Sequence, residues 1–254
     1  MIELRHIGFS YERERILHNI DLTFARGELC AIVGPNGCGK TTLLKLIGRL
    51  LEPDEGEILL NARPLSQYDR KEFARNVALM PQTRPVPEMT VGEYVANGRY
   101  PYLAFAQKMS RADEEAVSWA LETADVARFS QRSLSELSGG ERQRAYLALL
   151  LAQDTKCVLL DEPTTYLDLS AQFAVMQIMQ KMRDAGKCVI VVLHDLSMAL
   201  QYCDRIVVMQ NGSVAAVDTP NALAASEIWN NVFDVRCVPF DQENMHSFLF
   251  QPKK

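Results

Sequence analysis

Residues 34–42 read GPNGCGKTT, three glycines followed by a lysine and two threonines. The first eight positions fit the pattern G-x-x-x-x-G-K-[ST], in which backbone N–H groups surround phosphate groups. The apolar segment LCAIV precedes this loop, and TLLKLIGRLL follows it with the spacing of a helix over residues 42–51. The order of strand, glycine loop and helix therefore predicts an α/β fold with a phosphate site at the start of the helix.

The side chains of this loop have separate expected roles. Lys40 would reach the outer phosphates of a nucleotide, the Thr41 hydroxyl would coordinate Mg²⁺, and Cys38 would be a small filler. The helix start would add about half a positive charge. The alternative, a tight glycine turn before an ordinary helix, is disfavoured by the flanking strand and helix. The expected nucleotide contacts are Gly34, Pro35, Asn36, Gly37, Cys38, Gly39, Lys40, Thr41 and Thr42.

Two carboxylates end a second apolar strand in VLLDEP, residues 158–163. Open α/β sheets bind ligands at the carboxyl ends of their strands. Asp161 would therefore hold Mg²⁺, mainly through water, and Glu162 would polarise an attacking water; the alternative is a pair of solvated carboxylates. His194 ends the strand CVIVVL in the same way, either to contact the γ-phosphate or as a satisfied structural residue.

Composition excludes several classes of protein. The chain has 254 residues, 48% hydrophobic content and a net charge of −5, which favours a globular protein and argues against a nucleic-acid partner. Its apolar runs are shorter than the roughly 20 residues that span a bilayer, so a membrane role would require a partner. The N-terminus lacks a signal-peptide pattern. Cys30, Cys157 and Cys188 lie in strand-like segments and are expected to be reduced thiols of a cytosolic protein.

The order of elements along the chain predicts an inserted helical region. Alternating segments at residues 2–11 and 16–24 indicate antiparallel strands, and residues 76–82 indicate a short strand. The following seventy residues are mainly helical, with Ser110 and Asp113 capping a helix. Strand and helix then alternate again up to a hairpin turn at Asn211-Gly212. The last segment predicts one short helix near residues 222–229 and two strands.

The stretch LSGGERQR, residues 137–144, carries a resemblance to a known family. With GPNGCGKTT, MPQ, VLLDEP, TTYLD and LHD, it appears in the order and spacing of the ATP-binding cassette (ABC) family, so the resemblance covers essentially the whole chain. It implies an α/β P-loop NTPase (RecA-like) core with an N-terminal antiparallel β subdomain and an inserted α-helical subdomain. Residues 1–254 would form one ATPase domain, with 1–82 and 158–254 as the core and 83–157 as the helical subdomain.

The resemblance also implies that two chains stack head to tail. ATP would then lie between the phosphate loop of one chain and the helix that begins in LSGGERQR, here called the signature helix, of the other. Ser138, Gly139 and Gly140 would then present a hydroxyl and unobstructed N–H groups to the γ-phosphate. Two glycines cost a helix about 2 kcal/mol, less than several charge-assisted hydrogen bonds at about 1.5–3 kcal/mol each. A capping box of Ser138 and Glu141 that merely contains glycines is the alternative.

By the same resemblance, Gln82 would sense Mg²⁺ and the attacking water, and Asp168 would lie at the dimer seam. Tyr166 departs from the family pattern, which usually has a small residue there. Tyr11 would stack on adenine or, equally, belong to the core. Catalysis would thus rest on Glu162, His194, Gln82 and Lys40, and the metal ligands would be Thr41, Gln82 and Asp161.

The segment around GRYPY, residues 98–102, resembles ATPase subunits of bacterial importers for iron-siderophores, haem and cobalamin. Such a subunit is a homodimer on the cytoplasmic face of the inner membrane, bound to a separate permease and served by a substrate-binding protein. Tyr100, Tyr102, Leu103 and Phe105, grouped among prolines, would form an apolar groove for a partner helix or, alternatively, the core of the insert. A soluble cassette for iron-sulfur cluster assembly is the competing class, whereas a kinase or GTPase would leave LSGGE unused.

Overall fold

A six-stranded sheet forms the centre of the computed structural model, which describes residues 1–104, 107–242 and 245–252. Its strands, in spatial order, are β10 (Ser213–Asp218), β9 (Arg205–Gln210), β3 (Glu28–Val33), β8 (Cys188–Val192), β7 (Cys157–Asp161) and β6 (Val77–Met80). All neighbours pair in parallel except β10 with β9. Strands β7 and β8 are buried throughout, because both faces of a parallel sheet are covered. The predicted α/β core is therefore present.

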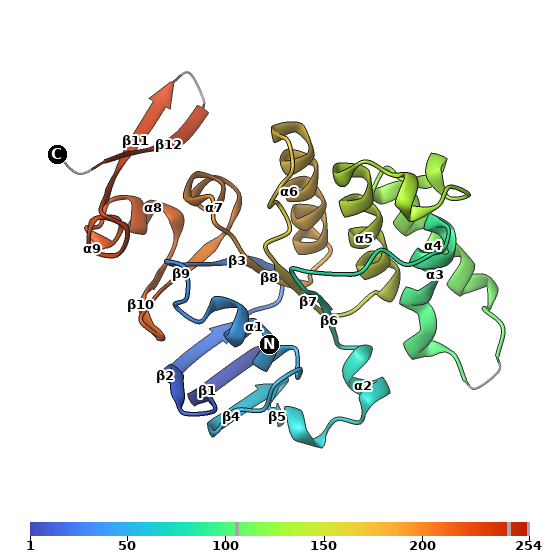
Figure 1. Ribbon diagram of the computed structural model, residues 1–254, viewed down its shortest axis with the longest axis horizontal. Coiled ribbons are helices and arrows are strands. Elements are labelled where there is room, and N and C mark those ends of the chain that lie inside the picture. Colours follow the sequence, from blue (N-terminus) through green and yellow to red (C-terminus); the bar gives the residue numbers. More distant parts are fainter. Residues whose placement is uncertain (105–106, 243–244, 253–254) are drawn as a thin grey trace.

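A second, antiparallel sheet lies beside the first and is formed by the N-terminal quarter of the chain (Figure 1). Its order is β2 (Glu14–Phe24), β1 (Ile2–Tyr11), β4 (Glu55–Leu60) and β5 (Arg63–Pro64). The helix α1 (Lys40–Ile47) lies between the two sheets, and Leu43 belongs to the same buried cluster as Ile7 of β1 and Ile32 of β3. The phosphate loop is thus anchored to both sheets through α1.

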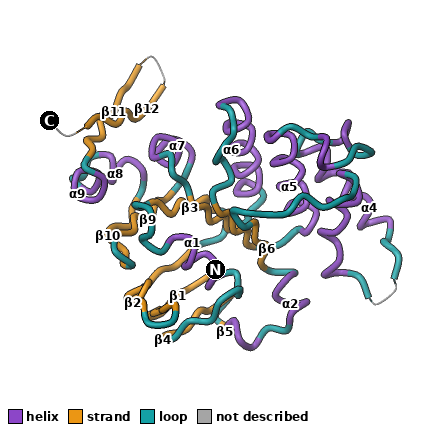
Figure 2. The backbone as a smooth tube through the Cα atoms, viewed as in Figure 1, coloured by secondary structure: helices purple, strands orange, loops and turns teal. Residues whose placement is uncertain are grey.

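The helical region predicted between β6 and β7 is present and lies beside the β6 edge of the central sheet (Figure 2). Its elements are α3 (Val91–Ala96), η2 (Asn97–Tyr102), α4 (Arg111–Thr123), η3 (Ala127–Phe129), η4 (Leu134–Glu136) and α5 (Gly139–Gln153). Capping boxes begin α3, α4 and α5, and those at Ser110 and Ser138 confirm sequence predictions. The local capping pattern therefore fixes where these helices start.

The remaining elements complete the covering of the central sheet. Helices α6 (Leu169–Asp184) and α7 (Leu196–Tyr202) cover the face opposite α1, and α2 (Arg70–Ala74) follows η1 (Leu65–Gln67). The chain ends in α8 (Pro220–Ala224), α9 (Ile228–Phe233) and a hairpin of β11 (Val235–Gln242) and β12 (Met245–Pro252). In the described ranges, no helix combines the length and apolar character needed to cross a bilayer.

Two helix predictions were wrong in extent. The first helix ends at Ile47 rather than near residue 51, because Arg49 adopts a φ of 57°, which an α-helix does not accommodate. The single helix expected near residues 222–229 is two helices. Between them, the Ser226 hydroxyl donates to Leu223 O at 2.7 Å and accepts from Ile228 N, which ends one helix and starts the next.

Candidate functional site

The phosphate loop joins the end of β3 to the start of α1. Gly37 and Gly39 have φ values of 78° and 99°, a region that side chains with a Cβ rarely adopt. No side chain caps α1, so its first N–H groups are available to an anion. The Lys40 ammonium is buried and donates to Gly34 O at 2.8 Å and Pro35 O at 3.0 Å. The loop therefore holds a cation and free N–H groups around one space.

That space is a cavity of about 270 Å³. Its walls bring together residues of the loop and the ends of two other strands: Ile16, Asn36, Gly37, Gly39, Lys40, Thr41, Thr42, Glu162 and His194. Six of the nine expected loop contacts, together with Glu162 and His194, therefore face one cavity, whereas Gly34, Pro35, Cys38 and Gln82 do not line it. Ile16 was not predicted, since an isoleucine in an alternating strand carries no signal of a ligand.

Asp161 lies where a metal ligand was expected. The Thr41 hydroxyl donates to Asp161 Oδ1 at 3.1 Å, so the two predicted Mg²⁺ ligands are adjacent. Burial raises the pKa of Asp161, the hydrogen bond from Thr41 opposes the rise, and the charge of Glu162 adds to it. A hydroxyl and a carboxylate oxygen suit a hard divalent cation that keeps several waters, so this donor set fits Mg²⁺.

Glu162 is held at both carboxylate oxygens. His194 Nε2 lies 2.5 Å from Glu162 Oε1, and Gln82 Nε2 donates to Glu162 Oε2 at 2.6 Å. The Thr165 hydroxyl donates to the same Oε2 at 3.3 Å, a contact that sequence reasoning missed. The structure thus brings together Gln82, Glu162 and His194, which follow β6, β7 and β8. Because these parallel strands are neighbours, their carboxyl ends share one edge of the sheet.

The signature residues line a different cavity. About 340 Å³ in volume, it is bordered by Ser138, Gly139, Gly140, Glu141, Arg144, Tyr166, Leu167, Asp168, Ser170 and Ala171. None of the described residues lines both this cavity and the one at the phosphate loop. Ser138 caps α5, and its hydroxyl accepts from Glu141 N at 3.3 Å. One chain therefore presents the two predicted halves of an ATP site on separate surfaces.

The two signature glycines have different surroundings. A Cβ at Gly139 would meet nothing closer than Leu167 Cδ2 at 4.0 Å, so packing within this chain does not require glycine there. A Cβ at Gly140 would lie 2.8 Å from Ala171 Cβ on α6. The sequence interpretation assigned both glycines to ligand access, but Gly140 has a second reason, which is the close approach of α5 to α6.

The seam residues expected from the family resemblance flank this second cavity. Asp168 caps α6, with Oδ1 accepting from Ala171 N at 2.9 Å, so its carboxylate has a structural role as well. Tyr166 is fully exposed and has a φ of 62°, unusual for a non-glycine residue. A solvent-exposed aromatic ring therefore lies next to the start of the signature helix.

Tyr11 is neither core nor part of the phosphate cavity. Its side chain is 41% exposed and meets the ring of Phe9 edge to face at 4.9 Å. The alternative that placed it in the core is wrong, because Tyr11 is exposed and belongs to neither buried cluster. Cys38 is buried, which raises the pKa of its thiol, in agreement with a small filler.

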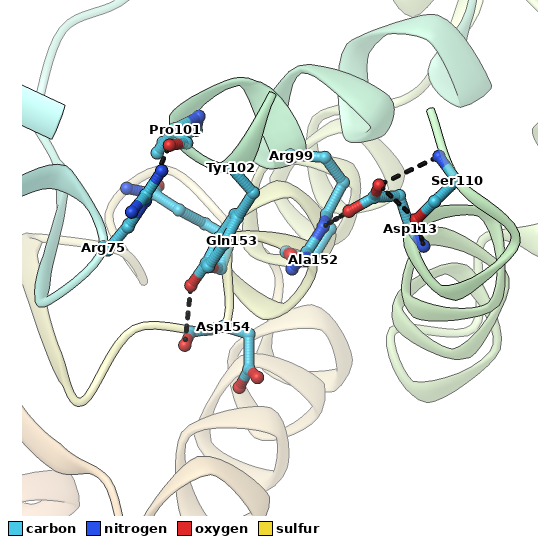
Figure 3. A network of polar contacts seen from close by, with 9 residues as sticks. All are labelled: Arg75, Arg99, Pro101, Tyr102, Ser110, Asp113, Ala152, Gln153 and Asp154. Carbon is cyan, nitrogen blue, oxygen red and sulfur yellow. Dashed lines mark hydrogen bonds and ion pairs between the residues drawn. The ribbon is translucent and has the colours of Figure 1, made fainter. Parts of the chain in front are cut away.

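The GRYPY segment forms a polar network instead of an apolar groove or core (Figure 3). The Tyr102 ring lies between the guanidinium groups of Arg99, 4.0 Å away, and Arg75, 5.6 Å away. Its hydroxyl donates to Gln153 O at 2.9 Å, at the end of α5. Tyr100 is 64% exposed and Leu103 is half-buried. Phe105 lies outside the described residues.

Arg99 of the same network ties η2 to α4 and α5. Its Nε donates to Asp113 Oδ1 at 2.9 Å, and its Nη1 donates to Ala152 O at 2.8 Å. Both side chains of this ion pair are largely buried. Hydrogen bonds from Ser110 are the main reason that the pKa of Asp113 is lowered. The motif therefore holds the helical region together.

Comparison with known proteins identifies the family. The ABC transporter family model matches residues 17–165. The petrobactin import ATP-binding protein FpuD of Bacillus anthracis is 38% identical over 238 residues, covering 93% of this chain and 87% of that protein. The hemin import ATP-binding protein HmuV of Nocardia farcinica is 40% identical over 242 residues, covering 91% of this chain and 83% of that protein.

Among solved structures, a dimeric bacterial ABC transporter cassette, MJ0796, is similar with a TM-score of 0.75 and 29% identity, covering 87% of this chain and 99% of that chain. The similarity therefore extends through the sheets and the helical region alike. With the family model spanning more than half of the chain and two relatives aligned over nearly all of it, the chain belongs to the ABC transporter family of ATP-hydrolysing proteins.

Proposed function

We propose that this chain is the ATPase subunit of a bacterial importer for a metal chelate such as an iron-siderophore, haem or cobalamin. The proposal is supported by relatives whose names are petrobactin import and hemin import ATP-binding proteins. The observation that carries the catalytic part is that Gln82 and His194 both contact the Glu162 carboxylate, and that Glu162 and His194 line the cavity that the phosphate loop borders.

In the proposed site, backbone N–H groups of residues 34–42 bind the phosphates of ATP, and Lys40 leaves its carbonyl partners for the outer phosphates. Thr41 and Asp161 hold Mg²⁺, with Gln82 as a further oxygen ligand, and the ion would neutralise charge on the phosphate oxygens. We further propose that Tyr11, although outside the cavity, reaches the adenine ring.

The hydrolytic role falls to Glu162. Its carboxylate orients a water for attack on the γ-phosphate, while His194 and Gln82 hold the two carboxylate oxygens in place. His194, which is partly exposed on the cavity wall, also contacts the γ-phosphate. The left-handed backbone at Glu162, with a φ of 51°, aims this side chain at the cavity.

Two copies of the chain form the working unit. The separation of the signature cavity from the phosphate cavity supports a head-to-tail dimer, in which Ser138, Gly139 and Gly140 of one copy approach the γ-phosphate bound by the other. The similar cassette of known structure is a dimer. Asp168 and Tyr166 then lie at the seam between copies. Binding of ATP closes the dimer, and hydrolysis opens it.

The dimer transmits this motion to an integral membrane permease, which receives its cargo from a substrate-binding protein. The chain is then peripheral, on the cytoplasmic face of the inner membrane. We propose that residues 83–157 move as a helical subdomain against a core of residues 1–82 and 158–254. The coupling surface lies where these parts meet, near the exposed Tyr100.

The test is ATP hydrolysis in membranes that contain the chain with the products of its neighbouring genes. An added iron-siderophore, haem or cobalamin, supplied with its binding protein, should stimulate hydrolysis in the presence of Mg²⁺. Co-purification with soluble partners only, and no stimulation by any chelate, would contradict the proposal and favour a soluble cassette.

A further inference from the structure

Arg84 connects the loop after β6 to the signature helix. It lies two residues after Gln82, and its Nη2 donates to Gln143 Oε1 on α5 at 2.9 Å. Gln143 is buried, and its Nε2 donates to Pro163 O at 2.6 Å. Pro163 directly follows Glu162. A chain of two hydrogen bonds therefore runs from the loop of Gln82, through α5, to the backbone of the catalytic carboxylate.

The surroundings of Arg84 hold its guanidinium in a fixed orientation. The group lies 4.0 Å from the centre of the Tyr146 ring, one helical turn beyond Gln143, and Tyr146 meets Tyr94 of α3 edge to face at 5.3 Å. Burial lowers the pKa of Arg84, opposed by the two tyrosines. Its Nη1 is buried and has no hydrogen-bond partner within the described part of the chain. Arg84 is half-buried as a whole, and a buried N–H group without a hydrogen-bond partner is costly, so this arrangement is not explained by hydrogen bonding alone.

The backbone at Glu162 has a conformation that needs support. A φ of 51° is unfavourable for a residue with a Cβ and persists only where neighbouring contacts fix it. Glu162 N donates to Val192 O at 3.2 Å on one side, and Pro163 O accepts from Gln143 on the other. A shift of α5 relative to the loop would therefore move the Pro163 carbonyl, one residue beyond Glu162, and through it the backbone that carries the carboxylate.

We infer that Arg84 is a positioning residue that acts through Gln143 and Pro163 to hold Glu162 in its hydrolytic orientation. The inference rests on the proposed hydrolytic role of Glu162. The contacts from Arg84 through Gln143 to Pro163 link the position of the signature helix to the Glu162 carboxylate within one copy of the chain. They are separate from the direct contact of Gln82 with Glu162. Arg84 does not line the cavity at the phosphate loop, so it affects turnover through the geometry of Glu162.

The experiment measures kcat, the KM for ATP and thermal unfolding for variants of the full-length chain. Arg84→Met keeps the length of the side chain but removes its charge and hydrogen bonds. Gln143→Glu keeps an acceptor for Arg84 but removes the donor to Pro163 O. Arg128→Met is the matched control, since Arg128 also stacks on an aromatic ring, that of Phe129 at 4.7 Å, in the helical region.

We expect Arg84→Met and Gln143→Glu each to lower kcat about tenfold, with the KM for ATP within about twofold and the melting temperature within about 2 °C of the parent. Arg84→Lys should recover part of the loss, and the control should match the parent. In the double variant Arg84→Met/Gln143→Met, kcat should fall no further than in Gln143→Met alone, because both residues belong to one chain of contacts.

Losses of kcat that multiply in the double variant would overturn the inference, as would a folded Gln143→Glu variant with kcat within about twofold of the parent. A near-parental kcat of Gln143→Glu would overturn the inference even if Arg84→Met fails to fold. Failure of the proposed function is distinguishable, because normal turnover by Glu162→Gln would remove the role of Glu162 itself, whatever the Arg84 variants do.

Discussion

Glu162 Oε1 lies 2.5 Å from His194 Nε2, on the carboxyl edge of two neighbouring parallel strands. The opposite oxygen of the same carboxylate accepts from Gln82, which follows the third strand of this edge. A carboxylate held on both sides has little rotational freedom, so in the proposed mechanism it would already be oriented toward a water before the nucleotide binds. The relationship makes Glu162 the centre of the catalytic prediction.

Replacing Glu162 with glutamine should lower ATP turnover by about 100-fold or more, because the amide cannot act as a base. Binding of ATP should persist, since the phosphate loop is unchanged. Steady-state hydrolysis and equilibrium binding of a fluorescent ATP analogue measure the two properties. Glu136→Gln, at an exposed position of η4, is the control and should keep full activity. Normal turnover by the Glu162 variant would contradict the role assigned to it.

The sequence predicted this catalytic edge because its signals are local. Asp161, Glu162 and His194 stand at the ends of apolar runs, and the parallel order of the strands brings them to one edge. Gln82 lies at the same edge, but its role was implied by the family resemblance and not by a local signal. The capping boxes were predictable for the same reason. Contacts between distant segments were not predictable: the approach of Gly140 to Ala171 and the hydrogen bond from Arg84 to Gln143 of α5 depend on how the helices pack, which no local sequence pattern indicates.

Gly139 provides a prediction that separates stability from function. Because its Cβ position is open, Gly139→Ala should raise stability by up to about 1 kcal/mol through helix propensity. Turnover should nevertheless fall about tenfold or more, since the methyl group would keep the helix start away from the γ-phosphate in the dimer. Thermal unfolding and ATP hydrolysis measure the two effects. Unchanged turnover by Gly139→Ala would contradict the proposed contact of this glycine with the nucleotide.

Gly140 should behave differently, because its missing Cβ is needed by the protein itself. Gly140→Ala places a methyl group 2.8 Å from Ala171 Cβ, and overpacking of this kind costs about 1–3 kcal/mol. The double variant Gly140→Ala/Ala171→Gly should recover packing at this contact but not turnover. Denaturant unfolding of the single and double variants tests the first expectation. Equal stability of the parent and Gly140→Ala would show that α6 moves aside at little cost.

The capping box of α5 predicts a dependence of stability on pH. Hydrogen bonds from the Ser138 backbone and hydroxyl lower the pKa of Glu141 below its ordinary value of 4.5. The stabilisation is therefore fully present above that ordinary value and is lost as the pH falls through the lower pKa of the folded state. Unfolding of the parent and of Glu141→Gln, compared at about pH 6 and pH 3, should give a stability difference that shrinks in acid. A stability difference between the parent and Glu141→Gln that is the same at both pH values would contradict this prediction.

Tyr100 and Tyr102 lie two residues apart, but replacing them should change the free energy of unfolding by very different amounts. Tyr102→Ala removes a ring between two guanidinium groups and a hydrogen bond to Gln153 O, with an expected cost of about 2–4 kcal/mol. Tyr102→Phe should cost about 1 kcal/mol, the value of the hydrogen bond alone. Tyr100→Ala should stay within about 0.5 kcal/mol of the parent, since its side chain is 64% exposed. Denaturant unfolding measures all three.

The same two tyrosines test where the chain would couple to the proposed permease. If the exposed Tyr100 belongs to the coupling surface, Tyr100→Ala should leave basal ATP hydrolysis of the isolated chain intact but weaken stimulation by chelate in membranes. Tyr102→Phe is the matched control, because it keeps the ring in place between Arg75 and Arg99 and should retain full stimulation. Full stimulation in Tyr100→Ala would show that Tyr100 is not part of the coupling surface.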